Sequence, residues 1–212
     1  MKISVVPIGL RLAFIPIITA SLCFLLNWII AGVIFVLTTF FILYFFRDPE
    51  RKVPNIPNAI ISPADGKVLS VEKIKSPEFP NGEAIRIKIF LSIFNVHIQR
   101  SPIKGNIFSV IYSPGKFFNA LKEKCSEDNE NNLVGIKNDK TRVLVKQIAG
   151  VIARRIICLC RIGDSIERGD KLGLICFGSR VETYFPSNVE VRIKPGMKVY
   201  GGKSILGIVK EE

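Results

Sequence analysis

Histidine is almost absent from this 212-residue chain, which has one copy, His97, and one tryptophan. A Cys-x-x-Cys pair is also missing, and the five cysteines are an odd number. These absences argue against a disulfide framework and against a zinc site, so we expect reduced thiols and no metal. No P-loop or Gly-x-Gly-x-x-Gly motif occurs, which gives no support to a nucleotide cofactor.

Charged residues are missing from residues 12–46. One helix over this run would be roughly 52 Å long, whereas the hydrocarbon core of a bilayer is about 30 Å. Two helices that break near Asn27 and Trp28, or at Gly32, fit better than a single crossing. Both flanks are basic, and basic flanks stay in the cytoplasm. We expect residues 1–46 to be a membrane-associated hydrophobic hairpin; a signal peptide would have a shorter apolar core.

The formal net charge of +12 indicates a polyanionic partner. Each Lys or Arg near an anionic leaflet contributes about 1 kcal/mol of attraction. Nucleic acid is the usual alternative for a basic protein, but no basic block interleaved with aromatic residues occurs here. We therefore expect an anionic membrane surface at the cytoplasmic face of the cell membrane, and no nucleic acid.

Residues 47–212 have the composition of an ordinary folded domain, with short β-branched runs bounded by Gly, Pro, Asp or Asn. Runs of this kind are typical of strands. No regular helical pattern separates them, which argues against a doubly wound parallel sheet. The polar run 123–132 is expected to be a loop that follows one helical turn at 117–122. The main expected strands are 59–61, 67–72, 84–91, 107–112, 142–147, 156–161, 172–176, 189–193 and 205–209.

One internal repeat occurs in the last quarter of the chain. Segments 163–175 and 196–208 share a frame of Gly, about six residues, Gly, four or five residues, Gly and an apolar pair. Each segment predicts a strand–turn–strand unit in which glycine supplies positive φ. Such units resemble the half-barrels of biotinyl and lipoyl carrier domains. The expected fold is mainly β, a barrel-sandwich-like domain preceded by the helical hairpin; two hairpins in an ordinary all-β domain are the alternative.

Three polar positions are weak signals when each is taken alone. His97 ends the apolar run FNVHI, where a lone histidine is usually a surface or hydrogen-bonded residue. Asp65 lies in an Asp-Gly pair, which commonly forms a turn. Gly178 and Ser179 follow an apolar run, and their ordinary interpretation is also a turn.

These positions lie in three of five motifs that together resemble phosphatidylserine decarboxylase proenzymes. The resemblance extends from about residue 45 to the C-terminus, includes the apolar leader and is closest to the short form of the family. Five motifs in the same order make the match specific. They are FFRDPER (45–51), SPADGKV (62–68), FNVHIQRSPIKG (94–105), QIAGVIARRI (147–156) and FGSRVETYFP (177–186).

The resemblance implies that the domain of residues 47–212 cuts itself between Gly178 and Ser179, which gives a 1–178 chain and a 179–212 chain that stay together. Ser179 Oγ would attack the carbonyl of Gly178, and elimination and hydrolysis would leave a pyruvoyl group at residue 179. His97 is the only imidazole that could take the serine proton. Asp65 would hold the tautomer of His97, as in a Ser-His-Asp triad.

The mature site is then implied to convert phosphatidylserine to phosphatidylethanolamine through a Schiff base on the pyruvoyl group, with His97 as proton donor. Neither pyridoxal phosphate nor a metal is required. One alternative is a pyruvoyl decarboxylase of a soluble amino acid, which would not need the apolar leader. Another is a non-catalytic membrane adaptor with a lipoyl-like sandwich and a modified Lys171, which would not need Asp65, His97 and the Gly-Ser pair together.

The chain departs from the larger bacterial members at Phe94, where they have a second histidine. A role of that imidazole cannot be transferred, and burial of the substrate carboxylate beside Phe94 is our hypothesis. Lys116, Phe117 and Phe118 are candidates for contact with the membrane interface, although a solvated loop explains them equally well. A homodimer would be consistent with the family.

Overall fold

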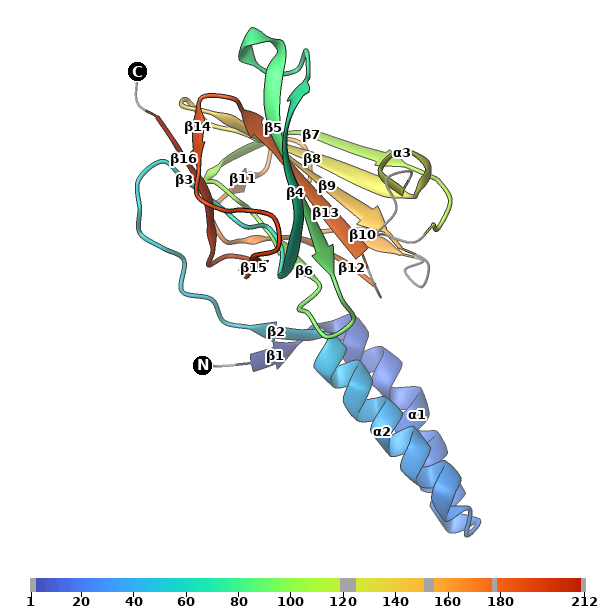
Figure 1. Ribbon diagram of the computed structural model, residues 1–212. Coiled ribbons are helices and arrows are strands. Elements are labelled where there is room, and N and C mark those ends of the chain that lie inside the picture. Colours follow the sequence, from blue (N-terminus) through green and yellow to red (C-terminus); the bar gives the residue numbers. More distant parts are fainter. Residues whose placement is uncertain (1–2, 119–124, 151–154, 177–178, 211–212) are drawn as a thin grey trace. The chain divides into compact units, whose positions relative to one another are not determined.

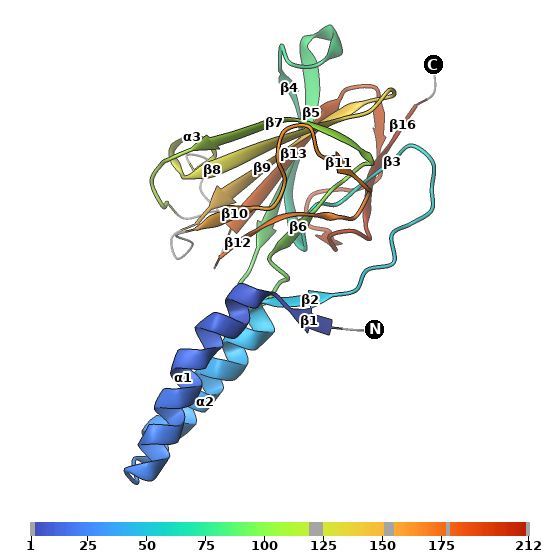
Figure 2. The ribbon, with the colours of Figure 1, turned by 180° about the vertical axis from the view of Figure 1, so that it is seen from behind.

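The computed structural model of the protein describes residues 3–118, 125–150, 155–176 and 179–210 (Figure 1). The contacts divide the chain into two units, Met1–Glu50 and Arg51–Glu212. The first unit is a helical hairpin, and the second is built mainly of strands (Figures 1 and 2). The expected fold class, a mainly β domain with an N-terminal helical hairpin, is confirmed.

The first unit consists of helices α1 (Pro7–Leu25) and α2 (Ile29–Phe45). The break between them contains Asn27, whose positive φ of 60° allows the tight reversal. One of the two positions predicted for the break is therefore confirmed. Strands β1 (Ile3–Val5) and β2 (Arg47–Pro49) pair antiparallel and close the base of the hairpin.

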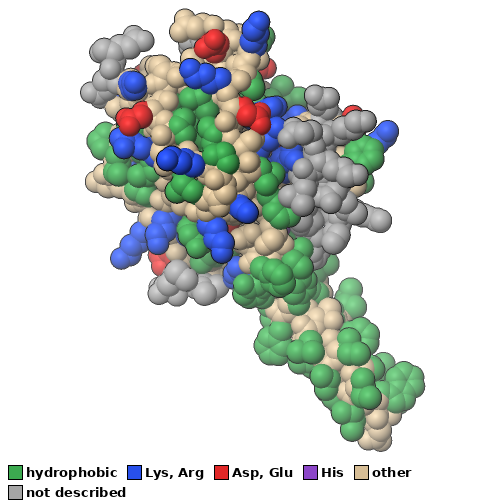
Figure 3. Space-filling model, viewed as in Figure 1, with side chains coloured by type: hydrophobic (Ala, Val, Ile, Leu, Met, Phe, Trp, Pro, Cys, Tyr) green, Lys and Arg blue, Asp and Glu red, His purple; other side chains and the backbone are tan. Residues whose placement is uncertain are grey.

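Close packing of small residues holds the two helices together. Gly9 lies against Phe46, and Gly32 lies against the ring of Phe24, so neither glycine has space for a Cβ. Helix α1 is long and apolar enough to cross a membrane, and α2 is slightly shorter. Hydrophobic side chains cover the hairpin surface in Figure 3. Four hydroxyls bond to the carbonyl oxygen four residues earlier, as an apolar environment requires: Thr19, Ser21, Thr38 and Thr39.

The second unit contains the remaining strands and two short helical elements. All nine of the expected strands are present, with small shifts at their ends. The elements are β3 (Ala59–Ile61), β4 (Gly66–Lys75), η1 (Pro80–Gly82), β5 (Glu83–Leu91), β6 (Ile98–Arg100), β7 (Gly105–Ser113), α3 (Cys125–Asp128), β8 (Asn131–Lys137), β9 (Arg142–Ala149), β10 (Ile156–Cys158), β11 (Ser165–Ile166), β12 (Lys171–Ile175), β13 (Ser179–Pro186), β14 (Val189–Val191), β15 (Lys198–Val199) and β16 (Ile205–Val209).

The expected loop at 123–132 is wrong in part. Strand β8 already begins at Asn131, and α3 occupies residues just before it. Asn131 and Asn132 are buried because their amide groups bond to other groups inside the protein. The helical turn expected at 117–122 is not present at residues 117–118, and its other residues lie outside the described ranges.

The strands of the second unit form three sheets. The largest is an eight-stranded sheet in the order β11-β7-β8-β9-β13-β5-β4-β15. The two smaller sheets have the orders β10-β12-β6 and β14-β16-β3. The large sheet curls around the small ones (Figures 1 and 2), as in the barrel-sandwich arrangement that the sequence predicts.

The second unit contains one topology twice. One copy runs without interruption from β6 to β12, whereas the other runs β3-β4-β5 and then β13-β14-β15-β16. The small sheet β10-β12-β6 matches β14-β16-β3 strand for strand. The centre of the large sheet lies between β9 and β13, which are counterparts. Moving outward from it, β8 corresponds to β5, β7 to β4 and β11 to β15. The contiguous copy is therefore inserted into the other copy between β5 and β13.

Local geometry supports the duplication. Segments SPADGKVLSV (62–71) and SPIKGNIFSV (101–110) occupy equivalent positions, and each has a bulge at the same place. The four turn glycines of the internal repeat have φ between 75° and 95°, so the predicted positive φ is confirmed. Their amides donate equivalent hydrogen bonds: Gly163 to Ile107 O, Gly196 to Val68 O, Gly169 to Ser101 O and Gly202 to Ser62 O.

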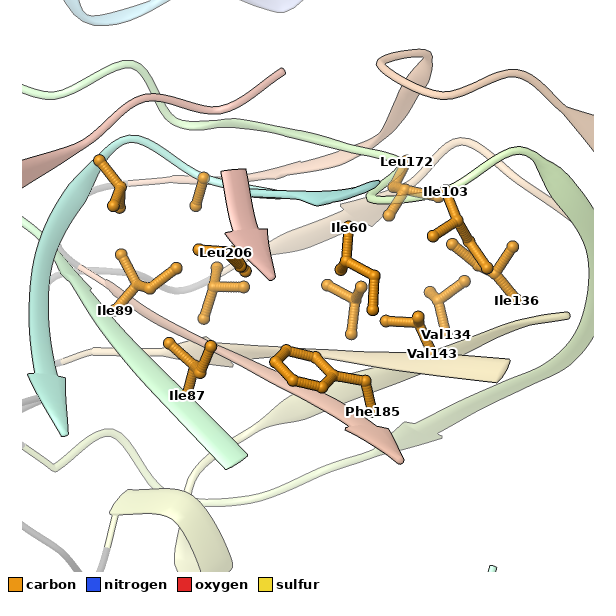
Figure 4. Close-up of a cluster of buried hydrophobic side chains, with 14 of the residues drawn as sticks. Ile60, Ile87, Ile89, Ile103, Val134, Ile136, Val143, Leu172, Phe185 and Leu206 are labelled. Carbon is orange, nitrogen blue, oxygen red and sulfur yellow. The ribbon is translucent and has the colours of Figure 1, made fainter. Parts of the chain in front are cut away.

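The hydrophobic core lies inside the curled sheet (Figure 4). Ile87 and Ile89 of β5, Val143 of β9 and Phe185 of β13 are almost fully buried there. Alternate residues of a strand point to opposite faces, so the residues between them face outward. In β13 these outward residues, Arg180, Glu182 and Tyr184, are polar and form a network beside the candidate site.

Candidate active site

Ser179 is the first residue of β13 and is fully buried. Its backbone pairs with Leu91 of β5 on one side and with Ala149 of β9 on the other. No group in the described ranges forms a hydrogen bond with its Oγ. Leaving a buried hydroxyl unsatisfied costs about 1–3 kcal/mol. Among the described residues Ser70 and Thr183 also have such a hydroxyl, so the place of Ser179 beside the His97 junction is what distinguishes it. Gly178, the other half of the predicted cleavage site, lies outside the described residues.

Ser179 and His97 lie at the two junctions between the copies. The outgoing junction connects β5 to β6 and ends at His97, and the returning junction connects β12 to Ser179. The junctions are adjacent, because Ile175 N donates to His97 O at 3.2 Å and Leu91 pairs with Ser179. In the inserted copy the equivalent connection is the plain hairpin at residues 138–141. The candidate site therefore occupies the place of a simple turn.

The imidazole of His97 is buried and oriented by its own loop. Its Nδ1 lies 2.9 Å from the carbonyl oxygen of Asn95. A carbonyl only accepts hydrogen bonds, so Nδ1 carries the proton and the lone pair of the neutral ring is on Nε2. The Asn95 side chain accepts hydrogen bonds from Ser92 N at 2.9 Å and from Ser92 Oγ at 2.8 Å. Asn95 thus fixes both the turn and the ring.

Asp65 immediately precedes β4 and is almost fully buried. Its carboxylate accepts hydrogen bonds from Arg51 Nη2 and from Gly201 N, each at 2.7 Å. It lies at the same end of the sheet as Ser179, because residues 67, 90 and 180 form one cross-strand row. Its strand is two strand spacings, roughly 10 Å, from that of Ser179. The predicted action of Asp65 on His97 stays a prediction.

A chain of buried amides extends inward from His97. Gln99 Nε2 donates to His97 O, and Gln147 Nε2 donates to Gln99 Oε1, both at 2.8 Å. Asn132 Nδ2 then donates to Gln147 Oε1, also at 2.8 Å. These three side chains come from β6, β9 and β8, and all are buried. The chain supports the backbone of His97 from within the protein.

The outward face of β13 carries a second buried polar network. Arg180 Nη1 donates to Ser126 Oγ at 2.9 Å and lies 3.5 Å from Glu182 Oε1. Ser126 Oγ donates to Glu182 Oε1 at 2.6 Å, and Tyr184 OH donates to Oε2 at 2.5 Å. Burial, followed by the charge of Glu182, raises the pKa of Tyr184. The network fixes the strand directly after Ser179.

Comparison with known proteins decides which family this geometry belongs to. Residues 38–207 match the family described as Phosphatidylserine decarboxylase. The chain belongs to the phosphatidylserine decarboxylase family. Relatives named phosphatidylserine decarboxylase proenzyme include one from Desulfotalea psychrophila, 46% identical over 92% of this chain and 90% of the relative. Another, from Oleidesulfovibrio alaskensis, is 39% identical over 99% of this chain and 96% of the relative.

Within this family framework, the sequence identifies only part of the site. The motifs single out Ser179, His97 and Asp65, and two of the three lie at adjoining junctions. Asn95 was not singled out, although the Ser-x-x-Asn spacing from Ser92 is a usable turn signal. Gln99 and Asn132 give no local signal, because their partners are distant in sequence.

Several other predicted features have mixed outcomes. Phe94 is 63% exposed, so the hypothesis that it buries the substrate carboxylate gains no support. Phe117 and Phe118 are more than one-third exposed. The described residues contain no cluster of three or more His, Cys, Asp or Glu side chains that could hold a metal ion. The described thiols at 23, 160 and 176 are buried, whereas Cys158 is only half-buried.

Proposed function

We propose that the protein decarboxylates phosphatidylserine to phosphatidylethanolamine and forms its own pyruvoyl group from Ser179. Membership of the family supports the substrate and the reaction. The observation that carries the mechanism is the buried, unsatisfied Oγ of Ser179, which begins a strand beside the junction that ends in His97. A hydroxyl kept free of hydrogen bonds is available to attack the preceding peptide bond.

Self-cleavage needs a base, because a serine hydroxyl is a weak nucleophile. His97 Nε2 takes the proton of Ser179 Oγ, and Oγ attacks the carbonyl carbon of Gly178. The amide C–N bond breaks as the ester C–O bond forms, and the released amine takes the proton. Removal of the α-proton then expels the Gly178 carboxylate. Hydrolysis of the resulting enamine releases ammonia and leaves a ketone at residue 179.

The residues present fit a pyruvoyl group at position 179. When formed, the pyruvoyl group supplies a carbonyl that binds the substrate amine and accepts the electron pair left by CO2. His97 returns a proton to the substrate carbon from the same nitrogen. Asp65, held by Arg51 and Gly201, is a positioning residue in this proposal.

The two pieces stay together after cleavage in this proposal. Strand β13 lies between β9 and β5 and is paired with both along most of its length. The fragment 179–212 would also keep β14 paired with β16, and β16 paired with β3. The cleaved fragment is therefore a second subunit of the enzyme rather than a released peptide.

The hairpin of the first unit accounts for access to an insoluble substrate. Its apolar surface and α1, which is long enough to span a bilayer, support membrane attachment. Lys and Arg side chains on the second unit, visible in Figure 3, suit an anionic lipid surface. We place the enzyme at the cytoplasmic face of the membrane.

The proposal is tested on the full-length protein in mixed micelles. The substrate is phosphatidylserine that carries a label in its carboxyl group. We expect labelled CO2 from the wild type and none from Ser179→Ala. Thr183→Val is the matched control, because it removes another buried hydroxyl without a hydrogen bond from the same strand. It should stay active. Release of CO2 only from free amino acids would favour a soluble substrate, and an uncut, inactive chain would favour the adaptor.

A further inference from the structure

Two thiols outside the candidate site lie in direct contact. Cys158 ends β10, Cys160 follows two residues later, and their sulfur atoms are 3.5 Å apart. A disulfide bond is about 2.05 Å long, so a modest rotation of the side chains would close it. Leu159 between them is 54% exposed, so this segment is at the surface of the protein. The proposed mechanism uses neither thiol.

The two thiols are chemically unequal. The hydrogen bond from Cys160 lowers the pKa of the Cys158 thiol, and a hydrogen bond with Asn132 lowers it further. Burial and the charge of Asp164 act in the opposite direction but are outweighed. The same sulfur–sulfur hydrogen bond and burial raise the pKa of the Cys160 thiol. Cys158 is half-buried and Cys160 is buried. Thiolate character combined with access is the pattern of an attacking cysteine, and its neighbour then acts as the resolving one.

We propose that Cys158 and Cys160 form a reversible dithiol–disulfide site that hydroperoxides oxidise. The Cys158 thiolate attacks the terminal peroxide oxygen, the O–O bond breaks, and the alkoxide or hydroxide leaves with a proton. The sulfenic acid formed on Cys158 then reacts with the Cys160 thiol, so that the S–S bond forms and water leaves. The dithiol loses two electrons, which reduce the peroxide. A small dithiol reverses the reaction.

The buried amides connect this site to the candidate active site. Asn132, which contacts the Cys158 thiol, donates to Gln147, and the chain continues through Gln99 to the carbonyl of His97. A disulfide sulfur is a poorer acceptor than a thiolate, so oxidation weakens the far end of this chain. Slower turnover in the oxidised form is the expected consequence, and this step alone rests on the proposed function.

The site is tested on the reduced full-length protein in detergent, exposed to hydrogen peroxide and then labelled with a maleimide after unfolding. We expect the tryptic peptide of residues 156–161 to carry neither maleimide label and to be about 2 Da lighter than the same peptide with two unlabelled thiols. Dithiothreitol should restore labelling of both cysteines. Cys23 and Cys176 should keep their labels. In Cys160→Ser, dimedone should trap a sulfenic acid on Cys158. Full labelling of residues 158 and 160, or oxidation of Cys176 first, would overturn the proposal.

The same samples separate this inference from the proposed function. Disulfide formation in a protein that never releases CO2 would leave the dithiol site standing and refute the decarboxylase. Normal turnover without any disulfide would refute the dithiol site alone. If the dithiol site is coupled to the candidate active site, peroxide should slow turnover by the wild type. It should not slow turnover by the double variant Cys158→Ser/Cys160→Ser. An oxidised wild type with unchanged turnover would overturn the coupling.

Discussion

At the scale of single residues, the orientation of His97 is the decisive feature. The loop that precedes His97 fixes the orientation of its ring. The Asn95 side chain holds the turn by accepting hydrogen bonds from Ser92, and the Asn95 carbonyl accepts the hydrogen bond of Nδ1. The basic nitrogen is thereby set to Nε2 by a backbone group. A backbone carbonyl is enough for that choice of tautomer, and the proposed action of Asp65 on His97 stays a prediction.

Asn95→Ala removes the clamp and should slow self-cleavage by about 10²-fold, the cost of a displacement on the order of 1 Å. His97→Ala removes the proposed base and should slow cleavage by about 10²–10⁴-fold. The fraction of cleaved chain is followed over time after synthesis in vitro. Asn95→Asp keeps an acceptor oxygen for Ser92 and should cleave near the wild-type rate. Cleavage of Asn95→Ala at the wild-type rate would rule out the clamp.

At the scale of elements, β13 lies between the hydrophobic core and the buried polar network of this domain. Val181 and Phe185 face the hydrophobic core, whereas Arg180 and Glu182 face the buried polar network. The strand begins with Ser179 and is paired on both sides. A displacement of the network would therefore move Ser179, the site of the proposed cleavage, along with the strand.

Glu182→Gln removes the carboxylate charge 3.5 Å from the buried Arg180 guanidinium and should destabilise the protein by about 3–5 kcal/mol. Glu190→Gln is the matched control, because Glu190 and Arg192 are also two residues apart but lie at the surface. Its effect should be below about 1 kcal/mol. Urea unfolding of both variants in detergent, followed by circular dichroism, measures the difference. Equal effects would show that the buried pair contributes no more than a surface pair.

At the scale of the whole molecule, the second unit is one topology used twice, with the candidate site at the junctions between the two copies and a plain hairpin at the equivalent place. Gly66 and Gly105 are equivalent, and an added Cβ would collide with the carbonyl oxygen of Phe90 or of Lys137. Gly66 adjoins Asp65 near the junctions, whereas Gly105 borders the plain hairpin. The duplication therefore supplies an internal control for effects on stability.

Gly66→Ala and Gly105→Ala should each destabilise the fold by about 1–3 kcal/mol, because both overpack a strand pair. Only Gly66→Ala should also slow self-cleavage. Thermal unfolding and the rate of cleavage are measured on both variants. A matching loss of cleavage rate in Gly105→Ala would contradict the assignment of the chemistry to the junctions.

The β-branched runs predict nine strands, and the uncharged run of residues 12–46 predicts the helical hairpin, because local composition decides both. Strand β13 is missed, since its alternate residues Arg180, Glu182 and Tyr184 are typical of exposed loops and are buried only through distant partners. Strand β8 is missed as a whole, because its first residues, Asn131 and Asn132, belong to a polar run that predicts a loop. The glycine frame reveals the last strands of each copy, but an insertion becomes visible only through strand pairing. Asn132 and Gln99 depend on contacts that no local pattern encodes.

The central claim is that the chain cuts itself at Ser179 and converts that residue to a ketone. Denaturing electrophoresis and intact mass spectrometry of the purified full-length protein test it directly. We predict two pieces, residues 1–178 with a free carboxylate and residues 179–212 with a pyruvoyl N-terminus, and one uncut chain for Ser179→Ala. An unbroken wild-type chain, or a second piece that begins with a free amine, would contradict the account.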